Sequence, residues 1–218
     1  MEDKVRSAYR QSRNIYDDVL TQSKWWSRLY IRFFWAVDDV LISQKLFAMI
    51  PDDFSGNLLD VPCGTLNLTS DKYRKMKRAN ITCLDYSEDM LSTARDRIAH
   101  QGIPNLKLMQ GDVGNLPFGR ETFDTVLSMN GFHVFPDKTR AYAETARVLK
   151  PGGLFCGCFY VQGERRRSDF VVNRVLAKKG WFTPPFQTKD QVLSTLKSYY
   201  STVDLYGDQA MVWFRCIK

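Results

Sequence analysis

Short apolar runs that end in acidic residues set the pattern of the first half of the chain. They lead from Leu58 into Asp60, from Ile81 into Asp85, and from Leu106 into Gly111 and Asp112. Short continuous apolar runs are typical of parallel strands buried on both faces, and open α/β sheets bind ligands at the carboxyl ends of such strands. The pattern therefore predicts three parallel strands that bring three carboxylates to one edge of a sheet.

Segments with helical periodicity alternate with these runs. Helices are expected over residues 66–79, 87–101, 137–149 and 168–178, and further strands over 123–128, 154–161, 199–206 and 211–217. The short turn at Gly207 and Asp208 requires the last two strands to form an antiparallel hairpin. We therefore predict an α/β fold with a mostly parallel sheet, an antiparallel last strand and helices on both faces.

Residues 1–50 carry no strand pattern and are rich in aromatic side chains. Trp26 and Tyr30 share one side of a predicted helix with Phe33 and Phe34. Core packing is the simpler interpretation of such a stripe. The alternative is an N-terminal helical lid whose aromatic face covers an apolar substrate pocket, because the segment precedes the first strand of the sheet.

Composition is consistent with a single folded domain. The chain has 218 residues, of which 44% are hydrophobic and 25% charged. We divide residues 1–218 into the lid (1–50), a core (56–160), a variable substrate-side segment (161–198) and a terminal hairpin (199–218).

The sequence shows neither a signal peptide nor a membrane-spanning apolar run, so a cytoplasmic protein is expected. The five cysteines lack the paired spacing of zinc sites, so no metal is expected.

The net charge of +7 leaves several partners open. Basic side chains gather at residues 72–78 and 165–167. Solvated surface is the simplest explanation, and peripheral contact with a membrane, nucleic acid or an anionic substrate is the alternative. The sequence does not indicate an oligomeric state.

The three carboxylates define the kind of ligand that the strand ends suit. Asp85 is placed to accept hydrogen bonds from a ribose diol, and Asp112, beside Val113, from an exocyclic adenine amine. Asp60, nearest the turn at Gly64, suits a cationic group. An acidic rim argues against a dinucleotide, whose pyrophosphate needs backbone N–H groups, and thus against a nicotinamide oxidoreductase.

Five motifs, in order, carry a family resemblance. They read Leu-Asp-Val-Pro-Cys-Gly-Thr, Leu-Asp-Tyr-Ser-Glu-Asp-Met-Leu, Gly-Asp-Val-Gly-Asn-Leu-Pro-Phe, Phe-Asp-Thr-Val-Leu-Ser-Met-Asn and Arg-Val-Leu-Lys-Pro-Gly-Gly. Over about residues 56 to 160 the chain resembles the class I S-adenosylmethionine-dependent methyltransferases, in particular the small-molecule branch with the menaquinone and ubiquinone C-methyltransferases.

This resemblance implies a Rossmann-like seven-stranded sheet, S-adenosylmethionine as cofactor and S-adenosylhomocysteine as product. It implies that Asp60, Gly64 and Thr65 surround the methionine part, that Asp85 holds the ribose, and that Tyr86, Asp112 and Val113 contact the adenine. It also implies that Ser128, Met129 and Asn130 border the sulfonium and the substrate. The remaining cofactor-binding candidates in these motifs are Pro62, Cys63 and Met90.

The first motif departs from the family pattern at two positions. Pro62 and Leu66 stand where the family usually has glycine. Neither residue adopts the conformations that glycine allows without cost, so a reshaped loop or weaker cofactor binding is expected. A degenerate cofactor-binding or scaffold protein therefore stays an alternative.

The function expected is methyl transfer to a small aromatic or apolar acceptor. His133 is the candidate general base if the acceptor must lose a proton, with a structural hydrogen bond as the alternative role. The candidate pocket residues are Trp26, Tyr30, His133, Tyr160 and Trp181. Methylation of RNA or protein is the alternative that the basic charge permits, although no RNA-binding module is recognisable, so a nucleic-acid partner is not expected.

Overall fold

The computed structural model describes residues 39–218. Trp26, Tyr30 and most of the predicted lid lie outside the described residues. None of the helices from residue 39 onward is long and apolar enough to cross a lipid bilayer.

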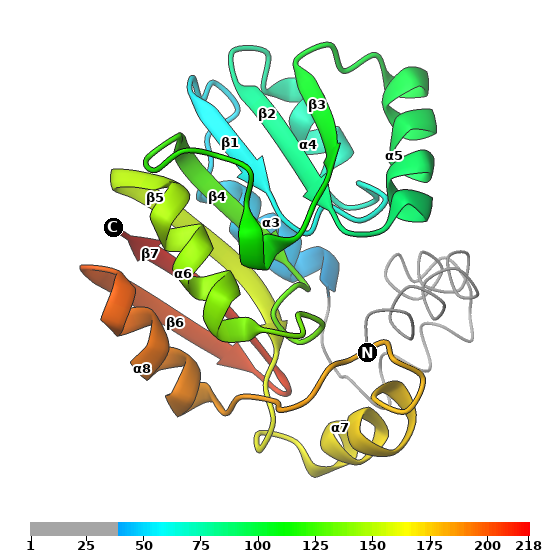
Figure 1. The fold of residues 1–218 in the computed structure, drawn as a ribbon, viewed down its shortest axis with the longest axis vertical. Coiled ribbons are helices and arrows are strands. Elements are labelled where there is room, and N and C mark those ends of the chain that lie inside the picture. The colour runs from blue at the N-terminus through cyan, green and yellow to red at the C-terminus, as the bar shows by residue number, and fades with distance from the viewer. Residues whose placement is uncertain (1–38) are drawn as a thin grey trace.

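A seven-stranded sheet runs through the described part of the chain (Figure 1). Its strands are β1 (Asn57–Asp60), β2 (Asn80–Asp85), β3 (Leu106–Gln110), β4 (Phe123–Met129), β5 (Leu149–Tyr160), β6 (Thr202–Asp208) and β7 (Met211–Ile217). Their order is β3-β2-β1-β4-β5-β7-β6, and β7 is antiparallel to both of its neighbours while the other pairs are parallel. The order reverses between β1 and β4, which is the position where sheets of this kind bind ligands. The predicted sheet and its antiparallel strand are confirmed.

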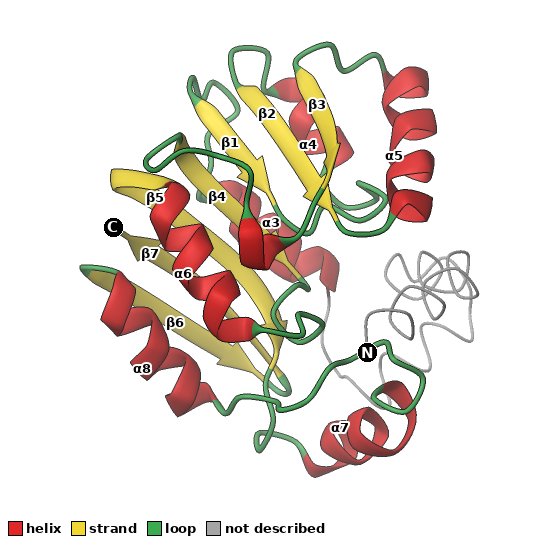
Figure 2. Ribbon diagram, in the orientation of Figure 1, coloured by secondary structure: helices red, strands yellow, loops and turns green. Residues whose placement is uncertain are grey.

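Helices cover both faces of the sheet (Figure 2). They are α3 (Asp39–Ala48), α4 (Ser70–Lys75), α5 (Glu88–Gln101), α6 (Lys138–Val148), α7 (Arg166–Val171) and α8 (Lys189–Tyr199), with the 3-10 turn η2 (Val113–Asn115) and the π-helical turn η3 (Val172–Leu176). Successive strand residues face opposite sides, so Leu58 packs in the core formed with α3, α4 and α5, and Leu59 in the core formed with α6 and α8. Both residues are fully buried, as the continuous apolar runs predicted.

The described end of the predicted lid belongs to the core. Ile42, Leu46 and Ile50 are each no more than 3% exposed and pack with Leu58 of β1. This part of residues 1–50 therefore stabilises the sheet. A lid formed by the preceding residues stays a prediction.

Three predicted element boundaries were wrong. The helix expected over 66–79 is limited to α4, because Leu66 has a left-handed φ of +58° and cannot continue a right-handed helix. Pro151, Gly152 and Gly153 do not simply end a helix but lie within β5, opposite an irregularity in the pairing with β4. Strand β6 begins at Thr202, three residues later than expected.

Helix α8 was missed altogether. Its signals are present in the sequence: Thr188 and Gln191 form a reciprocal capping box, and Val192 and Leu196 are buried four residues apart. The helix covers the face of the sheet that α6 also covers.

Candidate functional site

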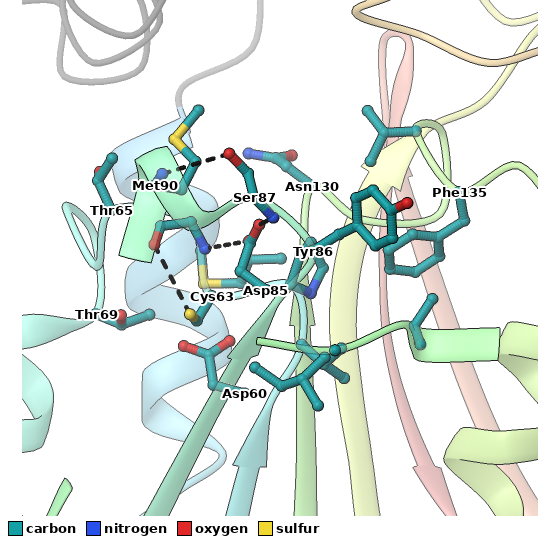
Figure 3. A pocket seen from close by; sticks show the side chains of 18 of the residues that line it. Asp60, Cys63, Thr65, Thr69, Asp85, Tyr86, Ser87, Met90, Asn130 and Phe135 are labelled. Atoms are coloured by element: carbon teal, nitrogen blue, oxygen red, sulfur yellow. Dashed lines mark hydrogen bonds between the residues drawn. The ribbon is translucent and has the colours of Figure 1, made fainter. Parts of the chain in front are cut away.

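One cavity opens where β1, β2, β3 and β4 end (Figure 3). All the cofactor-binding residues expected from the sequence lie in its wall, except Ser128. The wall residues that sequence analysis missed are mostly apolar or small: Val61, Asn67, Leu68, Thr69, Leu84, Ser87, Gly111, Val134, Phe135 and Pro136. The structure thus brings four strand ends together around a largely apolar cavity, and binding at these residues stays a prediction.

Asp60 is the most unusual polar group in this wall. Its side chain is 1% exposed, its Oδ2 accepts a hydrogen bond of 2.8 Å from the Tyr73 hydroxyl, and its Oδ1 has no hydrogen-bond partner within residues 39–218. Burial raises the pKa of Asp60 to about 7 and the Asp85 carboxylate adds to the rise, although the hydroxyls of Tyr73 and of the neighbouring Thr69 oppose this shift. A buried carboxylate oxygen without a partner is costly, and a cationic ligand group would satisfy it.

Asp85 has both carboxylate oxygens engaged by the backbone. Oδ2 accepts from the Gly64 N–H at 2.8 Å and Oδ1 from the Ser87 N–H at 2.9 Å. Burial raises the pKa of Asp85, and these two hydrogen bonds oppose that rise. Figure 3 shows both bonds. Asp85 therefore joins the turn after β1 to the start of α5. A ligand hydroxyl that donates to Asp85 would share a carboxylate oxygen that already accepts a backbone hydrogen bond.

The third carboxylate and an exposed tyrosine complete the far side of the cavity. Asp112 is exposed, and its Oδ1 accepts from the Gly114 N–H at 2.8 Å as the N-cap of η2. The cap holds Val113, which is buried, in the cavity wall. Tyr86 is 41% exposed, so its ring is available to a planar ligand group, while Met90 beside it is buried.

The turn after β1 keeps its left-handed conformations despite the departure from glycine. Gly64 has a φ of +54° and Leu66 a φ of +58°, so a leucine adopts the backbone geometry that glycine normally provides. The Leu66 side chain is 1% exposed and packs in the core beneath the turn. Pro62 and Gly64 lie in the cavity wall, so proline at position 62 and leucine at position 66 do not close the cavity.

The three candidates expected at the end of β4 differ in whether they line the cavity. Met129 and Asn130 lie in the cavity wall, and Asn130 has a φ of +55°. Ser128 lies within β4 opposite Gly157 of β5, is fully buried and does not line the cavity, so a position beside the ligand stays a prediction for it. Met129 points to the other face of the strand, and Asn130 reaches the cavity from the turn that follows β4.

His133 is not placed to act as a general base. Its Nδ1 accepts a hydrogen bond from the Tyr160 N–H at 3.2 Å, and its ring stacks on Phe182 with centroids 4.1 Å apart. Burial lowers the pKa of His133 to about 3, so the ring is neutral and carries its proton on Nε2. Neither ring nitrogen is then free to take a proton, and His133 does not line the cavity.

Tyr160 and Trp181 do not line this cavity, and their expected place in a substrate pocket stays a prediction. Tyr160 is 1% exposed, donates its hydroxyl to Asp169 Oδ1 at 2.6 Å and packs against Phe182 and Phe186. Trp181 is partly buried at the edge of the same core. We call the group of His133, Tyr160, Phe182 and Phe186 the aromatic cluster.

The aromatic cluster is fastened to the loop that forms one cavity wall. The Lys138 ammonium donates to the carbonyls of Phe135 (3.0 Å) and Thr183 (2.7 Å), and the Thr183 N–H donates to the His133 carbonyl at 2.9 Å. Burial lowers the pKa of Lys138 to about 8. The cluster therefore supports the loop that carries Phe135 in the cavity wall.

Comparison with known proteins extends this description. Residues 58–153 match the family described as methyltransferase domain. A chloroplastic 2-methyl-6-phytyl-1,4-hydroquinone methyltransferase of Oryza sativa subsp. japonica is 30% identical over 148 residues, which are 68% of this chain and 38% of the relative. The demethylmenaquinone methyltransferase of Listeria monocytogenes is 36% identical over 98 residues, which are 44% of this chain and 41% of the relative.

Among solved structures, an S-adenosylmethionine-dependent methyltransferase from Thermotoga maritima covers 98% of this chain and 99% of its own, with a TM-score of 0.69 and 17% identity. That likeness concerns the fold. The sheet order and the cavity are those of a Rossmann-like domain, a fold that binds ligands at the carboxyl edge of its sheet. Residues 58–153 thus resemble methyltransferase domains, and the chain spans only about two fifths of the two curated relatives.

Proposed function

We propose that this protein transfers a methyl group from S-adenosylmethionine to a small apolar or aromatic acceptor. The observation that carries the proposal is the buried, unpartnered Oδ1 of Asp60 in the wall of a cavity at the switch point of the sheet. The cofactor has an amino group and a sulfonium and lacks phosphates, which fits a site with three carboxylates and no basic side chain among the described wall residues.

The wall offers a partner for each part of the cofactor. Asp60 would accept hydrogen bonds from the ammonium, and Asp85 would hold the ribose while organising the turn at Gly64. Tyr86 would flank the adenine, with Asp112 at its edge. These assignments agree with the burial of the first two carboxylates and the exposure of Tyr86 and Asp112.

Alignment is the main catalytic contribution that this chain can make. The cofactor supplies a methyl group already activated on a sulfonium, so the protein must hold the acceptor in line and exclude water. Leu68, Val134 and Phe135 give the cavity an apolar wall suited to both tasks. Within residues 39–218 the wall contains no histidine or lysine, which favours an acceptor that reacts through positioning.

The acceptor class rests on the apolar wall and on the relatives. The relatives are named for phytyl hydroquinone and demethylmenaquinone, both aromatic rings with apolar side chains in their ordinary chemistry. We therefore expect a ring-bearing apolar acceptor. Methylation of RNA or protein and a scaffold without catalysis are the competing outcomes of the test below.

The first test is calorimetric titration with S-adenosylmethionine and S-adenosylhomocysteine, followed by transfer of a labelled methyl group. Micromolar binding, about −8 kcal/mol, is expected. Prenylated and unprenylated hydroquinones, total RNA and a peptide mixture then serve as acceptors, and label in the prenylated hydroquinone is expected. Label in RNA or peptide alone would overturn the acceptor class, and absence of cofactor binding would favour the scaffold.

The binding control should be Asp60→Asn and not Asp85→Ala. Asp85 holds the backbone N–H groups of Gly64 and Ser87, so its removal would disturb the turn whether or not it touches a ligand. The asparagine side chain of the Asp60→Asn variant would keep an oxygen for the Tyr73 hydroxyl, remove the charge and replace the other acceptor oxygen by an NH2 donor.

A further inference from the structure

A second surface lies on α7 and η3, which follow the carboxyl end of β5 and so belong to the same edge of the sheet as the cavity (Figure 1). Its exposed residues are Arg166, Arg167, Phe170, Asn173, Arg174, Val175, Lys178 and Lys179. We call Arg166, Phe170, Arg174, Val175 and Lys178 the α7–η3 face. None of them lines the cavity. The face is therefore separate from the proposed cofactor site.

The inner side of this segment is fixed to the protein. Val171, Val172 and Leu176 are buried in the main core. The carboxylate of Asp169 accepts from the Tyr160 hydroxyl at 2.6 Å and from the Gly163 N–H at 3.1 Å. Asp169, the only acidic residue of α7 and η3, thus directs its negative charge inward. Its hydrogen bonds hold the segment against the rest of the protein.

The outer side combines exposed apolar side chains with cations. Phe170 is 64% exposed and Val175 is 41% exposed, and they are two of the five exposed large apolar side chains in residues 39–218. The Arg174 guanidinium lies 6.0 Å from the centre of the Phe170 ring. Residues 164–179 contain six basic residues against the two acids Glu164 and Asp169.

We propose that the α7–η3 face docks on an anionic lipid surface, with Phe170 inserted at the interface and Arg166, Arg174 and Lys178 against the headgroups. Amphipathic segments that bind membranes in this way combine an exposed aromatic or aliphatic side chain with flanking cations. RNA would also attract the cations, but it gives no reason for an exposed aliphatic side chain, Val175, on the same segment as Phe170. The exposed apolar area therefore favours lipid.

Docking in this orientation would bring the cavity edge of the sheet toward the bilayer, where apolar acceptors concentrate. The docking step itself does not depend on the proposed methyl transfer, because it is measured without cofactor or acceptor. Failure of one proposal therefore leaves the other open to its own test.

The experiment is co-sedimentation of the full chain with vesicles of phosphatidylcholine alone or mixed with phosphatidylserine. Binding to the mixed vesicles only is expected, and Phe170→Ser should weaken it about tenfold. Arg174→Glu should weaken it by more than about fivefold, since each basic residue near the surface contributes about that factor and the change also adds a negative charge.

Matched variants elsewhere on the surface serve as controls. Tyr206→Ser removes a 48% exposed ring on β6, and Lys107→Glu makes the same charge change on the exposed surface of β3. Both should bind vesicles as the parent does. Equal losses in the controls, unchanged binding of Phe170→Ser, or no preference for phosphatidylserine would overturn the proposal. Retention of an RNA gel shift by Phe170→Ser but not by Arg174→Glu, without vesicle binding, would assign the face to RNA.

Discussion

The cavity wall and the aromatic cluster are joined through Lys138, which donates to the carbonyls of Phe135 and Thr183, yet one buried polar group of the cavity differs from those of the cluster. In the cavity, one oxygen of Asp60 is buried without a partner among the described residues. In the cluster, His133 Nδ1 and the Tyr160 hydroxyl both have partners. A buried acceptor left open is costly unless a ligand completes it, whereas a saturated cluster is already stable. The comparison therefore separates residues that would bind from residues that position.

The largest expected effect concerns the stability of the ligand-free protein. The pKa of Asp60 rises from 3.8 to about 7 on folding, so the folded state keeps a proton that the unfolded state releases between these values. The free energy of unfolding should therefore fall as the pH rises through this window, by at most roughly 4 kcal/mol in total. Asp60→Asn should abolish this part of the pH dependence and be the more stable protein at pH 8.

Urea unfolding at a series of pH values measures this difference. Lys107→Glu is a control that changes an exposed charge without touching the cavity, and it should keep the parent's slope. A parent whose stability rises between pH 5 and pH 7 relative to Asp60→Asn would contradict the pKa assigned to Asp60.

The same substitution should have the opposite effect on cofactor binding. Loss of the charged acceptor is expected to weaken S-adenosylmethionine about a hundredfold, the usual range for a hydrogen bond to a charged group. Calorimetry measures this loss. Parent affinity should also fall as the pH drops below about 7, because the protonated Asp60 no longer balances an ammonium. Equal affinities of parent and variant would show that Asp60 does not contact the cofactor.

Sequence analysis located the strand ends well because they depend on local pattern. The apolar runs before Asp60 and Asp85 are short, the edge strand before Asp112 is more polar, and in a parallel sheet the ends of all three must meet at one edge. The surroundings of each carboxylate were not visible in the sequence. Whether an oxygen of Asp60 is paired depends on Tyr73, which reaches it only through the packing of α4 on the sheet.

His133 shows why the second region was misjudged. A histidine after β4 was a sound candidate base, but its role is set by Tyr160 and Phe182, which are 27 and 49 positions farther along the chain. No local pattern indicates such contacts. Leu66 is a similar case, because the sequence showed that glycine was replaced but not that leucine would keep the left-handed backbone.

Leu66 allows a test of how the cavity turn is held. Leu66→Ala should destabilise the protein by about 3 kcal/mol, since it removes a buried side chain and keeps the left-handed strain. Leu66→Gly loses the same packing but relieves strain of about 1 kcal/mol, so it should be the more stable of the two variants. Thermal unfolding compares them. A glycine variant more stable than the parent would mean that strain outweighs packing at this turn.

The smallest expected effect is on catalysis by His133 variants. His133→Asn keeps an oxygen in place of Nδ1 for the Tyr160 N–H, whereas His133→Phe keeps the stacking on Phe182 and leaves that N–H without its acceptor. Both should retain kcat within about tenfold, and the phenylalanine variant should lose about 1–3 kcal/mol of stability. With saturating S-adenosylmethionine the bound cofactor keeps Asp60 ionised, so Asp60 does not contribute an ionisation to the pH profile of kcat. Since the pKa of His133 is about 3, no ionisation near pH 6.5 should disappear in either variant. If an ionisation near pH 6.5 were present in the parent and absent from both variants, His133 would be a general base. The distinction between the cavity wall and the aromatic cluster would then be wrong.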